Sequence, residues 1–196
     1  MSQRDKSPKT HQRLIDVDVL KRIDVSDDLS LQLLDRSDAV AVLSAIGTDP
    51  AIRERVYVAS LMNTPEDVEK QVADMHDDGE LLRYVIRDHD EIIGMVNFWR
   101  AGDFFGALVA PDVCGIGYFL VPSARGRGIL TDVIKMFLGV VQRNIPVPEF
   151  IAFCEDDNLS SSAVLERVGF LATDETIDFS KLGVEERKYV MKVNQD

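Results

Sequence analysis

The chain has 196 residues, of which 45% are apolar and 29% charged, and its formal net charge is −12. This length and composition predict a globular protein with one well-buried domain and a short extension. The acidic excess excludes general affinity for nucleic acid, whose phosphates require Lys and Arg. It favours cationic partners, although acidic surfaces also serve solubility alone.

No apolar run reaches the roughly 18 to 20 residues that a membrane-spanning helix needs, so no membrane contact is expected. The opening "MSQRDKSPKTHQR" lacks an apolar stretch followed by small residues, which predicts no secretory signal and a cytoplasmic location. Cys114 and Cys154 lack the paired spacing of a zinc site, and the histidines show no ligand spacing. We therefore expect no metal.

Residues 1–28 are predicted to form an N-terminal extension. Its beginning is rich in Arg, Lys, Ser and Pro, which indicates a partly disordered tail. Further on, Ile15, Val17 and Val19 alternate with aspartates, a pattern that predicts an extra strand. Such a strand could pair with another chain, so monomer and homodimer both remain open. Residues 29–196 contain no linker or repeat and are predicted to be a single domain.

The rest of the chain has the periodicity of a mixed α/β domain. β-Rich runs predict strands at 29–34, 81–88, 91–100, 114–121, 148–155, 169–176 and 187–193. Capping residues followed by apolar residues at helical spacing predict helices after Ser37, Asp49, Thr64, Gly128 and Asn158. The fold class is therefore α/β, a mixed sheet with helices on its faces.

The segment "ARGRGILTDVIK" lies between a predicted strand and a predicted helix. Gly126 and Gly128 allow a sharp turn that brings successive N–H groups close to a ligand. The helix N-terminus has free donors and a dipole that favours anions, and Arg125 and Arg127 can add cationic donors. The pattern predicts a diphosphate-binding loop, although a plain turn and cap would use the same glycines. It matches neither GxxxxGK(S/T) nor GxGxxG.

This loop resembles the pyrophosphate motif Q/R-x-x-G-x-G/A of the GNAT superfamily of acyl-CoA-dependent N-acetyltransferases. Arg125 to Leu130 fit the motif except at Leu130, which replaces a small residue. A second signature, N-x-x-S-x-x-V-x-E-K/R-x-G-F, matches at Asn158, Ser161, Val164, Glu166, Arg167, Gly169 and Phe170. Two signatures in the right order are more specific than either alone. The likeness spans Leu29 to Val193 and is greatest to ribosomal-protein N-terminal acetyltransferases of the RimJ/RimL type.

The resemblance implies a twisted, mostly antiparallel GNAT-type sheet of six to seven strands, splayed between the fourth and fifth, with helices on both faces. It implies acetyl-CoA as cosubstrate and CoA as product. The implied reaction moves an acetyl group to a primary amine, on a protein N-terminus or a small molecule, by direct attack in a ternary complex. A catalytically weak CoA-binding sensor or assembly module on the same fold is the alternative.

The resemblance also implies site residues. The cofactor-binding residues are expected to be Phe119, Leu120, Val121, Arg125, Gly126, Arg127, Gly128, Ile129, Leu130, Thr131, Asn158 and Ser161. Ser161 is the expected proton donor to the departing CoA sulfur, and Tyr118 and Glu155 complete the catalytic set. Ordinary helix capping would also account for Asn158 and Ser161.

The sequence departs from the family where relatives commonly have a glutamate base, because this chain has Gly115 there. An α-amine, with a pKa of about 7.7 to 8.0, needs less help from a base than a lysine near 10.4. The departure therefore favours α-amino or other acceptors of low pKa. Substitute bases are Glu155, Asp112, Glu185 and Glu186, for each of which surface solvation is the alternative.

Two further features concern the acceptor side. Cys154 lies close to the second signature, so an acetyl-cysteine intermediate is conceivable, although a buried small residue is the simpler interpretation. Trp99, Phe104 and Phe105 could line an acceptor pocket, although aromatic residues in strands usually belong to the core.

Overall fold

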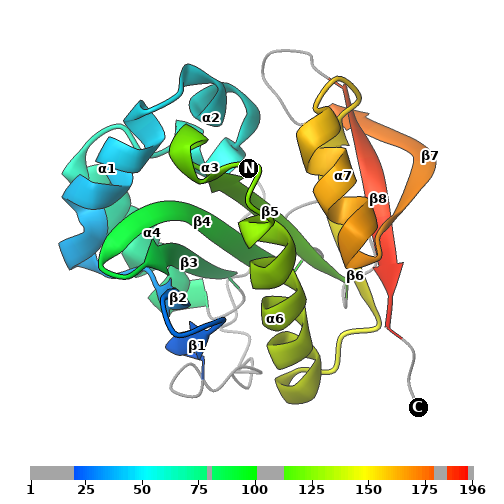
Figure 1. Ribbon diagram of the computed structural model, residues 1–196, viewed down its shortest axis with the longest axis horizontal. Coiled ribbons are helices and arrows are strands. Elements are labelled where there is room, and N and C mark those ends of the chain that lie inside the picture. The colour runs from blue at the N-terminus through cyan, green and yellow to red at the C-terminus, as the bar shows by residue number, and fades with distance from the viewer. Residues whose placement is uncertain (1–19, 79–80, 101–112, 179–184, 194–196) are drawn as a thin grey trace, which may run out of the picture.

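The computed structural model describes residues 20–78, 81–100, 113–178 and 185–193. Its centre is an eight-stranded sheet in the order β1-β2-β3-β4-β5-β6-β8-β7 (Figure 1). The strands are β1 (Arg22–Asp24), β2 (Leu29–Leu33), β3 (Leu81–Asp88), β4 (Glu91–Arg100), β5 (Cys114–Leu120), β6 (Glu149–Glu155), β7 (Leu171–Asp178) and β8 (Glu185–Lys192). Only β5 and β6 run parallel among the described strand pairs. The predicted mixed, mostly antiparallel α/β fold is confirmed, with eight strands instead of six to seven.

The additional strand is β1, which falls within the segment predicted as an extension. It pairs antiparallel with β2, with Ile23 opposite Leu31, and both of these side chains are buried. The predicted strand at Ile15–Val19 lies outside the described residues. The extra strand that the structure describes therefore comes later in the same stretch, where Ile23 reaches the core.

The helices are α1 (Ala39–Gly47), α2 (Pro50–Arg55), α3 (Tyr57–Ser60), α4 (Pro65–Asp78), α6 (Ile129–Asn144) and α7 (Leu159–Val168), with short 3-10 turns at Arg36–Asp38 and Pro122–Ala124. Ser37 was predicted as the cap of the first helix, and this was wrong. A 3-10 turn precedes α1, and Asp35 caps it by accepting a hydrogen bond from the Ser37 N–H. The short α3 was not predicted, because four residues carry too little periodicity.

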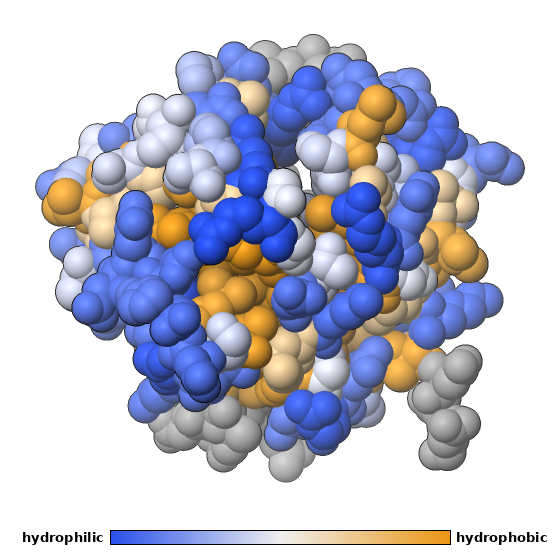
Figure 2. Space-filling view, in the orientation of Figure 1, coloured by the Kyte–Doolittle hydropathy of each residue, from blue (hydrophilic) through white to orange (hydrophobic). Residues whose placement is uncertain are grey.

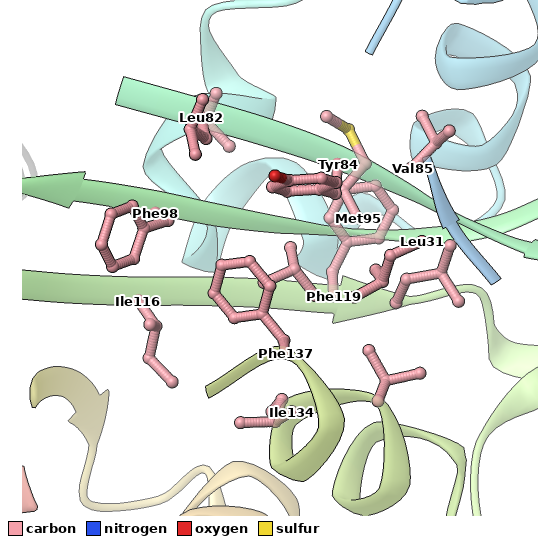
Figure 3. Close-up of a cluster of buried hydrophobic side chains, with 14 of the residues drawn as sticks. Leu31, Leu82, Tyr84, Val85, Met95, Phe98, Ile116, Phe119, Ile134 and Phe137 are labelled. Atoms are coloured by element: carbon pink, nitrogen blue, oxygen red, sulfur yellow. The ribbon is translucent and has the colours of Figure 1, made fainter. Parts of the chain in front are cut away.

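The two faces of the sheet are covered by different helices. Phe137 of α6 packs edge-on against Tyr84 and Phe98, with ring centroids 5.4 and 5.8 Å apart (Figure 3). On the opposite face, Arg83 contacts Gln71 of α4 through its side chain. Neighbouring residues of a strand point to opposite faces, so Tyr84 and Arg83 mark the two sides. α6 therefore covers one face and α4 the other.

The sheet opens between β5 and β6. β5 pairs with β4 along the whole of its own length, from Cys114 opposite Arg100 to Leu120 opposite Gly94. β5 and β6 pair at Cys114 and Gly115 alone within the described strands, so they meet at one end and diverge at the other (Figure 1). Alternate main-chain groups of β5 beyond Gly115 therefore face a gap and not a neighbouring strand. The predicted splay is present.

Candidate active site

Two cavities lie along β5 beyond Gly115. The loop-side cavity, about 590 Å³, is lined by Gly126, Gly128 and the first turn of α6. The sheet-side cavity, about 1190 Å³, is lined by Asn97, Trp99 and residues of α3, α4, β6 and β8. Five residues line both cavities: Arg55, Val56, Tyr118, Asn158 and Ser161. Two ligands, one in each cavity, would meet at these residues.

The surface is hollowed beside helices that line the loop-side cavity. Figure 2 shows hydrophilic side chains over most of this face, and a hollow between those over α2 and those over α7. Both helices contribute residues to the loop-side cavity. A long ligand could enter here and extend inward along β5.

The glycine loop ends the loop-side cavity. Gly126 and Gly128 have φ values of 75° and 80°, a region that side-chain-bearing residues rarely adopt. A Cβ on either would meet nothing within 4 Å, so the space above them is open. Gly128 caps α6 without a side-chain hydrogen bond, which leaves the first N–H groups of this helix free of such a partner. These donors and the helix dipole are suited to binding an anion.

The two loop arginines have different positions. Arg125 lines the cavity, where its Nη1 donates to Asp49 at 2.7 Å and its Nε donates to the Leu120 carbonyl at 3.0 Å. The hydrogen bond from Arg125 lowers the pKa of Asp49, so this carboxylate stays charged. Arg127 instead lies 3.5 Å from Asp88 and is not among the residues that line the loop-side cavity. Arg125 alone of the pair faces this cavity.

Most of the predicted cofactor residues come together here. The loop-side cavity is lined by Phe119, Leu120, Arg125, Gly126, Gly128, Ile129, Leu130, Thr131, Asn158 and Ser161. Val121 and Arg127 are not part of this lining. The Val121 side chain is buried, and its N–H already donates to the Ile93 carbonyl at 2.9 Å. The free main-chain groups of β5 must therefore precede Val121.

A pair of hydroxyl groups lies where the cavities meet. Tyr118 Oη is 3.1 Å from Ser161 Oγ, and it donates to the Ser161 carbonyl at 3.3 Å. Burial raises the pKa of Tyr118, so its hydroxyl stays protonated across the physiological range. Asn158 caps α7, because its Oδ1 accepts from the Ser161 N–H at 3.3 Å. The cap orients Ser161, and the pair can supply a proton to a leaving group.

Cys154 lies beside this pair but has the properties of a structural thiol. It is buried, and its Sγ donates to the Glu155 carbonyl at 3.3 Å. Burial raises the pKa of the thiol, which keeps it from forming the nucleophilic thiolate. These properties do not suit a covalent acetyl-cysteine.

Two carboxylates line the sheet-side cavity. Glu155 of β6 and Glu186 of β8 are directly opposite each other in register. Burial, together with the nearby charge of Glu155, raises the pKa of Glu186 to about 7. Burial also raises the pKa of Glu155, while Arg55, with its Nη1 3.4 Å away, opposes that rise. Glu186 can thus take up or release a proton near neutral pH.

The other predicted bases are placed elsewhere. Glu185 is exposed, and it is not among the residues that line the sheet-side cavity. Asp112 lies outside the described residues, as do Phe104 and Phe105. Of the predicted acceptor aromatics, Trp99 does line the cavity.

Trp99 also accounts for the glycine at the usual glutamate position. A Cβ on Gly115 would lie 2.2 Å from Trp99 Cε2, and one on Gly117 would lie 3.4 Å from Cζ3. The indole ring therefore lies over the backbone of β5, where a side chain at position 115 would project.

Arg83 and Asn97 are among the residues of the sheet-side cavity that sequence reasoning missed. Both are buried polar residues in strands, and both line the cavity. The available signal was a single polar residue within each of two otherwise apolar runs, Arg83 in "LLRYVI" and Asn97 in "MVNFW". That signal indicates a buried polar site without saying which cavity it faces.

A splayed sheet, with an anion-binding helix N-terminus on one side and a second cavity on the other, defines the class of GNAT-type acetyltransferases that the two signatures predicted. The chain belongs to the acetyltransferase (GNAT) domain family, whose model matches residues 28–171.

Known proteins of this class include close matches in fold. The ribosomal-protein-serine acetyltransferase of Escherichia coli (strain K12) is 27% identical over 117 residues, which cover 59% of this chain and 60% of that protein. A structure of RimL, a ribosomal L7/L12 α-N-protein acetyltransferase, in complex with coenzyme A matches with a TM-score of 0.75 at 22% identity, over 89% of this chain and 99% of that one. A structure of AAC(6')-Ib in complex with ribostamycin and coenzyme A matches with a TM-score of 0.69 at 20% identity, over 85% of this chain and 94% of that one. The predicted likeness to the RimL type is confirmed.

None of the helices in the described ranges is long and apolar enough to cross a membrane. No cluster of three or more His, Cys, Asp or Glu suited to a metal ion occurs in the same part of the chain.

Proposed function

We propose that this protein moves an acetyl group from acetyl-CoA to a primary amine, by direct attack while both substrates are bound. The observation that carries the proposal is that the loop-side and sheet-side cavities share Tyr118 and Ser161. A cofactor in one cavity and an amine in the other would place their reacting atoms together, which removes much of the entropic barrier.

The residues of the loop-side cavity fit acetyl-CoA. The diphosphate would lie against the N–H groups at Gly126, Gly128 and the start of α6, with Arg125 beside it. The pantetheine arm would lie along β5 and Asn158, where main-chain groups face the gap. Bound there, acetyl-CoA would supply an activated thioester.

The hydroxyl groups of Ser161 and Tyr118 would provide the proton that the departing sulfur needs. The sulfur of a departing CoA has the pKa of an ordinary thiol, about 8.5, so a donor speeds its release at neutral pH. Ser161 would donate this proton, and Tyr118 would be its hydrogen-bond partner, because Tyr118 Oη lies 3.1 Å from Ser161 Oγ. Main-chain N–H groups of β5 that face the gap would stabilise the negative charge that develops on the acetyl oxygen.

Glu186 is the base that the geometry favours. It lines the sheet-side cavity opposite Glu155, and its pKa of about 7 leaves it partly ionised at cellular pH. A carboxylate with this pKa can take a proton from an incoming ammonium group. The pair Glu155 and Glu186 would also attract that cation before it loses its proton.

The acceptor that best suits these features is the α-amine of a peptide or protein in the cytoplasm. An α-amine has a pKa of about 7.7 to 8.0, close to that of the proposed base, whereas a lysine near 10.4 is not. The names of the RimL and Escherichia coli relatives describe acetylation of ribosomal proteins. The chain matches only 60% of the length of the Escherichia coli relative.

One observation favours a second function, a CoA-binding sensor with little turnover. The usual glutamate position is Gly115, and Trp99 fills the space above it. A sensor would bind CoA and acetyl-CoA but release no thiol in the presence of any amine.

The test is thiol release from acetyl-CoA, measured with N-terminal peptides, polyamines and aminoglycosides as acceptors. The proposal predicts turnover with at least one amine class and a mass increase of one acetyl group on its amine. Binding of CoA without turnover across the panel would favour the sensor. Absence of CoA binding would rule out both.

A further inference from the structure

Arg83 and Asn97 form a buried polar pair in the floor of the sheet-side cavity. They are directly opposite each other on β3 and β4, so their side chains project from the same face of the sheet. Only 6% of Arg83 and 3% of Asn97 is exposed, yet both residues line the cavity. No step of the proposed reaction uses either of them.

The pair has unused hydrogen-bonding capacity. Arg83 Nη2 donates to Gln71 Oε1, but its Nε and Nη1 have no partner among the residues that the structure describes. Within the same residues, both amide atoms of Asn97 also lack a partner. Folding disfavours buried polar groups that nothing satisfies, and a pair that lines a cavity can be satisfied by a molecule that binds there.

The charge of the pair indicates the sign of that ligand. Burial lowers the pKa of Arg83 to about 10, so the guanidinium stays positive at neutral pH. Asp74 is the neighbouring opposite charge, but its side chain is exposed at the surface. A buried cation with free donors favours an anionic ligand, and a carboxylate can accept two parallel hydrogen bonds from a guanidinium.

Register gives the backbone spacing between this pair and β5, the strand that carries Tyr118. Arg83 lies opposite Asn97, which lies opposite Gly117, the residue before Tyr118. Two strand spacings of about 4.8 Å separate β3 from β5, or roughly 10 Å. An extended peptide advances about 3.3 to 3.6 Å per residue, so two to three residues span this distance.

We propose that Arg83 and Asn97 form an acceptor subsite that binds a carboxylate at the second or third residue of a peptide whose α-amine lies at Tyr118. The guanidinium donates to the carboxylate oxygens. The Asn97 amide donates to the carboxylate or pairs with the peptide backbone. This inference rests on the proposed function and deepens it, because it assigns a sequence preference to the acceptor.

The experiment compares matched peptides that begin with serine and carry Glu or Gln at position two, and a second pair that differs in the same way at position three. For the wild-type protein we expect kcat/KM to favour the Glu peptide at least tenfold in one of the two pairs. Arg83→Gln should remove this preference while leaving the affinity for CoA unchanged. Lys70→Gln is the control, because Lys70 is an exposed cation that also lines the cavity, and it should keep the preference.

Calorimetric binding of the same peptides to the CoA-bound protein gives a readout that does not depend on turnover. Equal affinity and equal kcat/KM for Glu and Gln peptides would overturn the subsite, and so would failure to bind either peptide. Because these comparisons use the wild-type protein, they decide the matter even if Arg83→Gln does not fold. Acetylation of other amines would then leave the proposed function standing, whereas loss of all turnover would count against that function separately.

Discussion

The indole ring of Trp99 occupies the space that a side chain at position 115 would need. A Cβ built on Gly115 would lie 2.2 Å from Trp99 Cε2, well inside the contact distance of two carbon atoms. The absence of a glutamate at position 115 and the position of the Trp99 ring are therefore linked. A side chain at position 115 and the indole ring would occupy the same space. Under the proposed mechanism, Glu186, which also lines the sheet-side cavity, acts as the base instead.

This contact predicts that Gly115→Ala destabilises the protein. The added methyl group overpacks the strand against Trp99, which should lower the free energy of unfolding by about 1 to 3 kcal/mol. Gly47→Ala is the control, because a Cβ there would meet nothing within 4 Å, and alanine favours the helix. Chemical denaturation should show a loss for the first variant alone. Equal stability of the two variants would mean that Trp99 does not hold this position.

Ser161→Ala should lower kcat by about 10²-fold, the scale of a lost general acid. CoA affinity should change little, because the loop donors and the Asn158 cap remain. Single-turnover kinetics and CoA titration together measure the two effects. Ser162→Ala is a matched control, because its Oγ donates to the Leu159 carbonyl and it is absent from the lining of both cavities. Similar rates for the two variants would remove Ser161 from the chemistry.

The pKa of Glu186 predicts a pH dependence of the rate. A base with a pKa of about 7 must be ionised to act. The pH profile of kcat/KM should therefore have a rising limb centred at about pH 7. Glu186→Gln should abolish this limb and lower the rate at neutral pH by about 10²-fold. Glu185→Gln, a change one residue away on an exposed side chain, should preserve the wild-type profile. A limb that survives in Glu186→Gln would assign the ionisation to another group.

The same carboxyl group predicts how stability varies with pH. The pKa of Glu186 is raised in the folded protein from 4.5 to about 7, so between these values the folded state binds a proton that the unfolded chain releases. Stability therefore falls as pH rises through this window. Denaturation of wild type and Glu186→Gln at pH 5 and pH 7.5 should show a smaller fall in the variant, because glutamine does not titrate. An identical fall in both would contradict the assignment.

Sequence alone predicted the elements whose causes are local. The glycines of the loop are required by positive φ, and Asn158 at a helix start is explained by capping. Both signals are read from a few neighbouring residues. The loop and the order of strands and helices along the chain could therefore be placed beforehand, whereas the role of Ser161 was implied only by the family resemblance.

The acceptor side could not be predicted in the same way, because it depends on how distant strands align. Glu185 and Glu186 are the same residue type and neighbours in the sequence. Neighbouring residues of a strand face opposite sides of the sheet, so only one of the two can face the cavity. The register of β8 with β6 brings Glu186 opposite Glu155. The pairing of Arg83 with Asn97 likewise follows from the register of β3 with β4. The filling of the space above Gly115 by Trp99 is a tertiary contact with no local cause.

The most direct test of the account is the CoA dissociation constant of Gly128→Asp compared with that of Gly128→Asn. Both side chains tolerate the left-handed conformation about equally and have nearly the same shape, so the pair isolates a negative charge at the start of α6. The account predicts that Asp weakens CoA binding at least tenfold relative to Asn, while pantetheine, which lacks phosphates, distinguishes the two much less. Equal affinity of the two folded variants for CoA would contradict a diphosphate site at this loop.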